Sequence, residues 1–341
     1  MRNCKLLGYV SVVLLIITSI MASCSSSLAS TGKTIKVKLG VGDPIHSSVG
    51  VTAQHFAKEV DKATEGKVKV EVFADGVLFG GDQNAAINMV QDGSMDATIL
   101  STSVYASFER RMNAISLPYL FKNYDEFMNF LEGSPGQELL VSLDRLNSVG
   151  LALMIRTFRN VTNSVRPIET PADFQGLKLR VPNNRLWVEF FGSLGADPTP
   201  MDFKEVYTAL QLKTIDGQEN PVEVPLANRF YEVQRFLSMT EHIADAYVLV
   251  FNKTLWSSLD PNVQDAIRAV AVETARFKLD YDLPAEKDIV AKLESHGMQV
   301  NWLTADQKFA FQEIALALYP RFEGLVGADF MDRTLKFLGR Q

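Results

Sequence analysis

The pattern of hydrophobic and polar positions predicts an α/β protein. Apolar and polar residues alternate at 36–41 and again at 68–73, which is the period of a half-buried strand. Between these strands, apolar residues recur at helical spacing from 48 to 64. A helix capped by Asp82 and a short apolar strand at 97–100 complete a β-α-β-α-β order. This order predicts a parallel sheet with helices on both of its faces.

The later part of the chain predicts further strands and one long helix. Strand patterns occur at 177–181 and 247–251. A long helical pattern begins at Pro261, a residue that is favoured in the first turn of a helix, and continues to Ser295. Pro284 interrupts this pattern, and an internal proline kinks a helix because it removes one backbone hydrogen bond. A chain of 341 residues is long enough for two lobes.

The start of the chain carries the features of an export signal. Arg2 and Lys5 precede an apolar run that is too short to span a bilayer, so we predict a signal peptide over 1–23. The four residues that end at Cys24 are similar to a bacterial lipobox, which predicts lipidation of Cys24; ordinary cleavage nearby is the alternative. The Ser-rich residues 24–33 are then expected to be a flexible tether.

Composition narrows the possible partners and chemistry. The formal net charge is −6, and loss of the predicted signal with Arg2 and Lys5 makes it −8, which argues against nucleic acid as a partner. Cys4 and Cys24 are the two cysteines, so we expect no disulfide in the mature domain. None of the four histidines is spaced from another ligand as metal sites require, and no catalytic or phosphate-binding motif occurs. The sequence therefore predicts no metal, no cofactor and no catalytic residue.

A candidate anion site lies in the stretch from Gly176 to Pro225. Arg180 is placed near the end of a strand that Pro182 terminates, and strand ends of α/β proteins face ligand crevices. Asn220 follows a tight turn and a short strand. A planar guanidinium with a carboxamide beside it suits a small carboxylate. The alternatives are that Arg180 forms a surface ion pair and that Asn220 only shapes a turn.

Five linked motifs resemble one protein family. They are Gly176–Pro182, Gly195–Met201, Glu205–Gln211, Asp216–Pro221 and Phe230–Gln234. Their order and spacing are similar to those of solute-binding subunits of tripartite ATP-independent periplasmic (TRAP) transporters of the DctP type. The likeness runs from about Thr34 to the C-terminus.

The resemblance implies a fold, a function and a location. The implied fold is the two-lobe α/β periplasmic binding protein fold, with a long kinked helix that spans both lobes. We expect lobe I at 34–156 and 246–284, and lobe II at 157–245 and 285–341. The implied function is a periplasmic or extracytoplasmic receptor that closes on a small organic acid and presents it to the TRAP membrane permease. No covalent step is implied, so we do not expect an enzyme.

The same resemblance adds ligand residues to Arg180 and Asn220. Arg159 matches the second ligand arginine of the family, although Arg156 could take this place and either could instead pair with an acid. Phe203 matches an aromatic residue of the family's pocket. Trp187 is a further candidate, with burial in the core as the default alternative.

The neutral character of other positions bears on the choice of ligand. Gln83 and Asn84 stand where family members often carry an acid and a base, and Ser101 and Val104 stand where sialic-acid binders carry a charged pair. An amide-rich wall suits hydroxyl groups. We therefore favour a sugar acid such as a uronate or an aldonate over sialic acid.

Three other functions stay open at this point. The first is a TRAP receptor for C4-dicarboxylates. The second is a secreted enzyme that acts on a sugar acid. The third is a receptor that serves an ATP-driven transporter or a sensor kinase, since such receptors share the fold.

Overall fold

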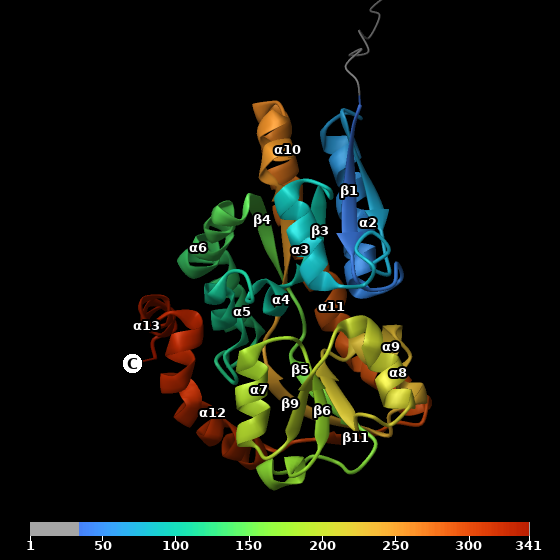
Figure 1. Cartoon of the computed structure of the whole chain (residues 1–341), viewed down its shortest axis with the longest axis vertical. Coiled ribbons are helices and arrows are strands. Elements are labelled where there is room, and N and C mark those ends of the chain that lie inside the picture. The colour runs from blue at the N-terminus through green and yellow to red at the C-terminus, as the bar shows by residue number, and fades with distance from the viewer. Residues whose placement is uncertain (1–33, 341) are drawn as a thin grey trace, which may run out of the picture. The chain divides into compact units, whose positions relative to one another are not determined.

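Two mixed β-sheets organise residues 34–340, which are the residues that the computed structural model describes (Figure 1). The predicted signal peptide 1–23, the lipidation candidate Cys24 and the tether 24–33 lie outside the described residues. No helix within the described range has the length and apolar character needed to cross a membrane.

The first sheet has five strands in the order β2-β1-β3-β10-β4. Its strands are β1 (Ile35–Val41), β2 (Val68–Phe73), β3 (Ala97–Ser101), β4 (Ser148–Ile155) and β10 (Ala246–Asn252). β1 pairs in parallel with β2 and β3, which confirms the parallel order predicted for the first three strands. β10 lies between β3 and β4 and runs antiparallel to both, so the complete sheet is mixed. A strand that returns from a distant part of the chain is not bound by the direction rule for β-α-β units.

The second sheet has six strands in the order β11-β9-β5-β8-β6-β7. Its strands are β5 (Arg159–Asn163), β6 (Lys178–Val181), β7 (Asp197–Pro200), β8 (Gly217–Asn220), β9 (Phe236–Ile243) and β11 (Gln299–Trp302). β6 pairs in parallel with β7 and β8, whereas β5 pairs antiparallel with β8 and β9. Parallel pairing of β6 with β8 brings the ends of both strands, and the residues predicted to bind a carboxylate, to the same edge of the sheet.

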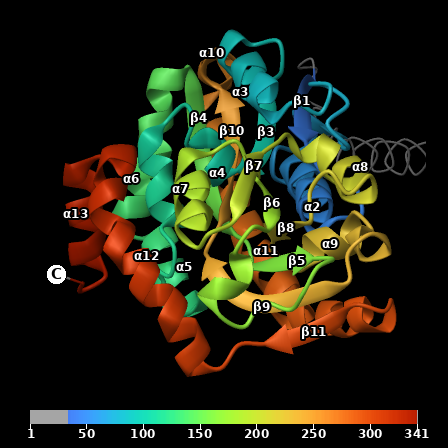
Figure 2. The same cartoon turned by 60° about the horizontal axis from the view of Figure 1, so that its bottom comes forward.

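Helices cover the sheets (Figures 1 and 2). The α-helices are α2 (Ser48–Ala63), α3 (Gln83–Asp92), α4 (Thr102–Tyr105), α5 (Tyr124–Glu132), α6 (Ser134–Ser142), α7 (Arg185–Ser193), α8 (Val206–Gln211), α9 (Glu223–Ala227), α10 (Lys253–Ser258), α11 (Pro261–Ser295), α12 (Ala305–Val326) and α13 (Ala328–Phe337). Short 3-10 helices occur at η1 (Arg110–Ser116), η2 (Leu143–Leu146), η3 (Pro171–Phe174), η4 (Phe203–Glu205) and η5 (Phe230–Glu232).

Apolar stripes on the helices explain how they pack. Val49, Phe56 and Val60 recur at helical spacing on α2 and are buried against the first sheet together with Ile267 of α11. On the opposite side of this sheet, α3, α5 and α6 bury their apolar side chains in a second cluster, which also contains α7 and α12. α12 packs against both α7 and η1, and α13 packs against η1 and α6.

The long helix α11 connects the two sheets. Asp260 caps its first turn by accepting a hydrogen bond from the backbone N–H of Asn262, and the helix runs for 35 residues through Pro284. It packs against α2 and β4 of the first sheet's layer, and against α9 and β11 near the second sheet. The prediction of one long, proline-containing helix that reaches both lobes is therefore confirmed.

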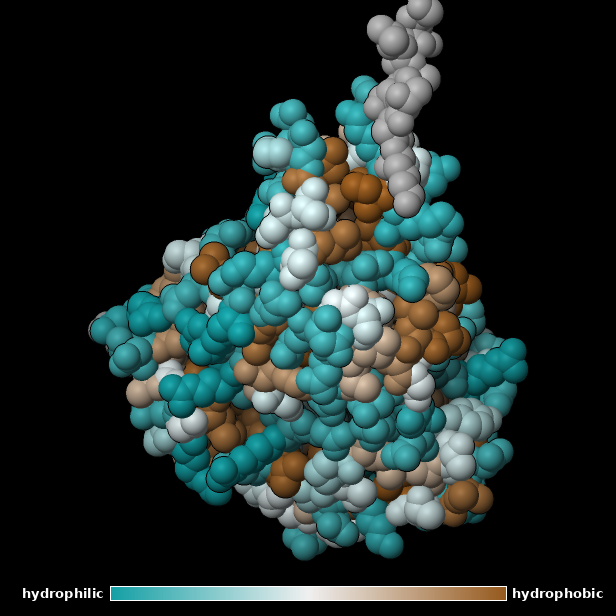
Figure 3. Space-filling view, turned by 45° about the horizontal axis from the view of Figure 1, so that its top comes forward, coloured by the Kyte–Doolittle hydropathy of each residue, from teal (hydrophilic) through white to brown (hydrophobic). Residues whose placement is uncertain are grey.

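The exposed surface is mainly hydrophilic on the face shown in Figure 3, with apolar side chains in separate groups. Scattered exposed apolar residues are normal for a soluble domain. The apolar side chains in this structure are concentrated instead in the clusters beneath the helices.

Candidate functional site

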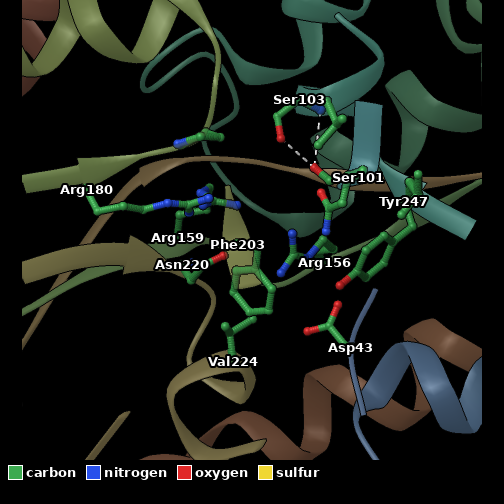
Figure 4. A pocket seen from close by; sticks show the side chains of 14 residues that line it. Asp43, Ser101, Ser103, Arg156, Arg159, Arg180, Phe203, Asn220, Val224 and Tyr247 are labelled. Carbon is green, nitrogen blue, oxygen red and sulfur yellow. Dashed lines mark hydrogen bonds between the residues drawn. The ribbon is translucent and has the colours of Figure 1, made fainter. Parts of the chain in front are cut away.

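A polar cavity lies where the ends of strands from both sheets meet (Figure 4). The space between its side chains, counted to the atomic surfaces and including the part open to solvent, is about 430 Å³. Fourteen residues line it: Asp43, Gln83, Leu100, Ser101, Ser103, Val104, Arg156, Arg159, Arg180, Pro182, Phe203, Asn220, Val224 and Tyr247. Three arginines in one cavity indicate an anionic ligand.

Arg180 reaches this cavity because of the alternation of β6. Leu179 and Val181 are fully buried in the core, so Arg180 between them projects to the opposite face of the sheet. Its Nε and Nη2 donate to the backbone oxygen of Met201 at 3.0 and 2.7 Å. The ring of Phe203 lies 5.9 Å from its guanidinium carbon.

Arg180 is a buried cation without a nearby counter-charge. It is 4 % exposed, and within residues 34–340 no carboxylate oxygen lies within 4.0 Å of its nitrogens. Burial lowers the pKa of Arg180 to about 10, and the charges of Glu219 and Asp202 offset only part of this effect. The guanidinium is still protonated at neutral pH, and an anion in the cavity would stabilise it.

Asn220 lies on the neighbouring strand. Gln218 is paired with Arg180 between β8 and β6, and Asn220 follows two residues later at the end of β8. Its Nδ2 donates to Oε1 of Gln218 at 2.6 Å, which fixes the carboxamide. Arg180 and Asn220 are thus held on two rigid strands at the same edge of the sheet.

Arg159 lines the cavity but is already paired. Its Nε and Nη2 donate to the two carboxylate oxygens of Glu219 at 2.6 and 2.8 Å, and its Nη1 donates to Asp245 at 2.7 Å. Burial alone would raise the pKa of Glu219, but the charge and hydrogen bonds of Arg159, with help from His242, lower it to about 2. The alternative that this arginine pairs with acids is therefore what the structure shows, and contact with a ligand stays a prediction.

Arg156 has a similar arrangement. Its Nη1 donates to Asp245 at 2.9 Å, and its Nη2 lies 3.6 Å from Glu223. The guanidinium carbon lies 4.5 Å from the ring centre of Tyr247. Arg156 and Arg159 therefore share Asp245 at the point where the chain crosses between the sheets.

Two of the remaining polar candidates line the cavity and one lies next to it. Gln83, at the start of α3, lines the cavity, and Asn84 lines an adjoining hollow that also includes Arg180 and Phe203. Ser101 lines the cavity, but its hydroxyl lies 2.9 Å from both carboxylate oxygens of Asp245. Ser101 is therefore tied to the acid that also holds Arg156 and Arg159.

Trp187 does not reach the cavity. It is fully buried on α7 in the same apolar cluster as Leu186 and Phe190, and its ring lies 5.6 Å from the guanidinium carbon of Arg159. The alternative of a core residue is what the structure shows, and we remove Trp187 from the site. A wide apolar face on α7 has room for the indole inside the core.

The sequence analysis missed three polar residues of the cavity: Asp43, Ser103 and Tyr247. Asp43 follows β1 in the loop that begins at Gly42, and Tyr247 lies in β10. Figure 4 shows the hydroxyl of Tyr247 directed at the carboxylate of Asp43. The position of Asp43 in a loop after a predicted strand was a usable signal, whereas Tyr247 stands among buried apolar residues and carried none.

Asp43 is a buried acid. It is 7 % exposed, and burial raises its pKa, while the charges of Arg156 and Lys278 and hydrogen bonds from Asn228 and Tyr247 offset part of that effect. Within residues 34–340, no group of three or more His, Cys, Asp or Glu side chains is placed to hold a metal ion. The cavity wall thus presents guanidinium, amide, hydroxyl and carboxyl groups.

Comparison with known proteins agrees with this geometry. Residues 41–324 match the family model of the bacterial extracellular solute-binding proteins, family 7, called DctP. The chain is 32% identical over 286 residues to the 2,3-diketo-L-gulonate-binding periplasmic protein YiaO of Escherichia coli, which covers 84% of this chain and 85% of the relative. It is 29% identical to the C4-dicarboxylate-binding periplasmic protein DctP of Shewanella loihica, over 93% of this chain and 94% of the relative.

A solved structure is also similar over nearly its whole length. The sugar acid binding protein DctPAm from Advenella mimigardefordensis, in complex with galactonate, superposes with a TM-score of 0.86 at 30% identity and covers 90% of this chain and 99% of its own. The two-lobe fold of periplasmic binding proteins is therefore shown for this chain. With the family model matched over most of its length, the chain belongs to the DctP family of bacterial extracellular solute-binding proteins, the solute receptors of TRAP transporters.

Proposed function

We propose that this protein is the extracytoplasmic receptor of a TRAP transporter and binds a sugar acid, such as an aldonate or a uronate. The observation that carries the proposal is Arg180, a buried guanidinium in the cavity without a carboxylate partner among the described residues. Asn220 on the next strand supplies a carboxamide beside it. The galactonate complex of the structural relative supports the choice of a sugar acid.

The physical basis of binding is the cost of burying the charge of Arg180. An arginine held away from water without a partner is destabilised, and a ligand carboxylate removes this cost while it forms charge-assisted hydrogen bonds. Because the cavity is lined from both sheets, a ligand makes all of its contacts only when the lobes are together. Ligand binding then favours the closed arrangement, which the membrane permease recognises.

We also propose the lobe boundaries that were predicted from the sequence. Lobe I comprises residues 34–156 and 246–284, and lobe II comprises residues 157–245 and 285–341. In support of these boundaries, the strands of the five-stranded sheet all fall in the first set and those of the six-stranded sheet in the second. The C-terminal helices of lobe II also pack on η1, which belongs to lobe I. The C-terminal helices therefore contact both lobes, and closure would have to preserve or rearrange these contacts.

A C4-dicarboxylate is the second candidate ligand. Two observations favour it: the relative from Shewanella loihica binds C4-dicarboxylates, and Arg156 and Arg159 also line the cavity. Each of these arginines is already paired with acids, which is why we place the sugar acid first.

We also propose that the protein acts by binding alone and is held at the membrane through a lipid on Cys24. The family consists of binding proteins, and the cavity offers arginines and amides rather than an activated nucleophile. A sample incubated with its best ligand should therefore return the acid chemically unchanged by mass spectrometry and NMR.

A thermal-shift screen of the mature protein over organic acids tests the function. A ligand at one hundred times its Kd adds about 2.7 kcal/mol to the free energy of unfolding, so one or more aldonates or uronates should raise the Tm by several degrees. Calorimetric titration then ranks the hits against succinate and malate. The proposal fails if no organic acid shifts the Tm, and its preference fails if succinate binds more tightly than every sugar acid.

A further inference from the structure

Most of the charged groups around the cavity are paired with a group of opposite charge. Arg156, Arg159 and Lys278 each have a carboxylate within 4.0 Å. Conversely, Glu219, Glu223, Asp245 and Asp282 each have a cation within this distance. Arg180 and Asp43 are the cation and the anion of the cavity wall that have no ion-pair partner within residues 34–340.

These two unpaired groups lie on opposite sides of the cavity. Figure 4 shows Arg180 with Asn220 on one side and Asp43 with Tyr247 on the other. Arg180 comes from the second sheet and Asp43 from the loop after β1 of the first sheet. The wall therefore presents at one end a guanidinium without an ion-pair partner among the described residues, and at the other end an acid whose charge Arg156 and Lys278 partly offset.

Asp43 has hydrogen-bonding capacity left for a ligand. A carboxylate offers about four acceptor sites, and Tyr247 and Asn228 each donate a hydrogen bond to it. At 7 % exposure its remaining sites have little access to bulk water. A buried carboxylate with unused acceptor sites is stabilised by a donor such as a hydroxyl group and destabilised by a second negative charge nearby.

We infer that Asp43 determines specificity at this site, accepting a hydrogen bond from a hydroxyl group of a monocarboxylate ligand and excluding a second ligand carboxylate. The inference rests on the proposed function, because it assumes that an organic acid binds with its carboxylate at Arg180. According to this inference, the ligand is an aldonate or a uronate, and Asp43 is the side chain that prevents diacids from binding.

A matched pair of ligands tests this inference. Galactonate and galactarate differ at one terminal carbon, which is a primary alcohol in galactonate and a carboxylate in galactarate. Juxtaposed like charges cost several kcal/mol, so wild-type protein should bind galactonate roughly 100-fold more tightly than galactarate in calorimetric titrations.

Asp43→Asn keeps the size of the side chain and removes its charge. This variant should bind galactarate more tightly and galactonate more weakly, so that the two affinities come within about fivefold of each other. Asp75→Asn is the control, because Asp75 is an exposed acid whose backbone N–H donates to the carbonyl of Asp43, and the change removes the same charge. The control should keep the wild-type ratio, and thermal unfolding establishes that each variant is folded.

The possible outcomes distinguish a failure of the Asp43 inference from a failure of the proposed receptor function. Equal binding of galactonate and galactarate by wild-type protein overturns the role of Asp43 and leaves a sugar-acid receptor, and this measurement needs no variant. An unchanged ratio in folded Asp43→Asn overturns it as well. If no organic acid of the screen binds, the proposed function fails and the inference fails with it.

Discussion

Replacement of Arg180 by methionine should strongly weaken ligand binding without weakening the fold. The change fills the same space with an apolar chain and removes the buried charge. A pKa lowered from 12.5 to about 10 corresponds to about 3 kcal/mol by which the folded surroundings, mainly through burial, disfavour the charged side chain. Loss of the two hydrogen bonds leaves the carbonyl of Met201 without these donors, at a cost of ~1–3 kcal/mol. The two effects nearly cancel, so the ligand-free Tm should stay the same or rise.

Binding should respond differently from stability. Removal of one partner of a buried charge pair costs ~2–5 kcal/mol, so the Kd for the best sugar acid should rise roughly thirtyfold to several thousandfold. Arg180→Lys should lose nearly as much affinity, because an ammonium cannot reproduce the two-pronged contact of a guanidinium.

Arg159→Met is the matched comparison for the argument. Here the substitution leaves Glu219 and Asp245 buried with fewer partners, and breaking such a pair costs ~3–5 kcal/mol of stability. Calorimetric titration and differential scanning calorimetry on both variants measure affinity and Tm. The reasoning is refuted if Arg180→Met binds within threefold of wild type, or if it lowers the Tm as much as Arg159→Met does.

Three further predictions address pH, packing and anchoring. Burial raises the pKa of Glu286 from its ordinary value of 4.5 to about 7, so the folded protein binds an extra proton between these two pH values and loses stability as pH rises through this window. Glu286→Gln should therefore raise the Tm at about pH 8 and change it little near pH 4, as a pH series of thermal unfolding can check. Gly217→Ala should destabilise the fold by about 1–3 kcal/mol or more in urea unfolding, because the added methyl carbon would lie 2.3 Å from the backbone oxygen of Thr162; a loss below a few tenths would contradict the packing at β8. Cys24→Ser should release the protein from the membrane fraction of its host, and a wild-type protein that is soluble with its N-terminus elsewhere would argue against lipidation.

The sequence predicted the local elements well where the pattern was regular. The alternating strands at β1 and β2, the apolar stripe of α2 and the Asp260–Pro261 start of α11 all depend on neighbours in the chain. Such signals follow from the periods of helices and strands and need no tertiary information. The antiparallel insertion of β10 between β3 and β4 had no local signal, because it depends on pairing with strands that lie far away along the chain.

The candidate site divides in the same way. Arg180, Asn220, Phe203 and Gln83 line one cavity, as a site built on strand and helix ends would. The pairing of Arg159 with Glu219 and Asp245 could not be predicted, because the partners lie 60 and 86 residues away along the chain. The burial of Trp187 was equally hidden, since a helix with a wide apolar face does not reveal which of its aromatic residues meets the cavity.

The central claim is that the cavity holds one carboxylate at Arg180, and a crystal structure of the galactonate complex tests it most directly. The account predicts the carboxylate of the ligand within hydrogen-bonding distance of the Arg180 guanidinium and the Asn220 carboxamide, at ~2.7–3.1 Å, with a hydroxyl group of the ligand on Asp43. A ligand carboxylate placed against Asp43, or one bound elsewhere while Arg180 makes no contact with the ligand, would contradict it.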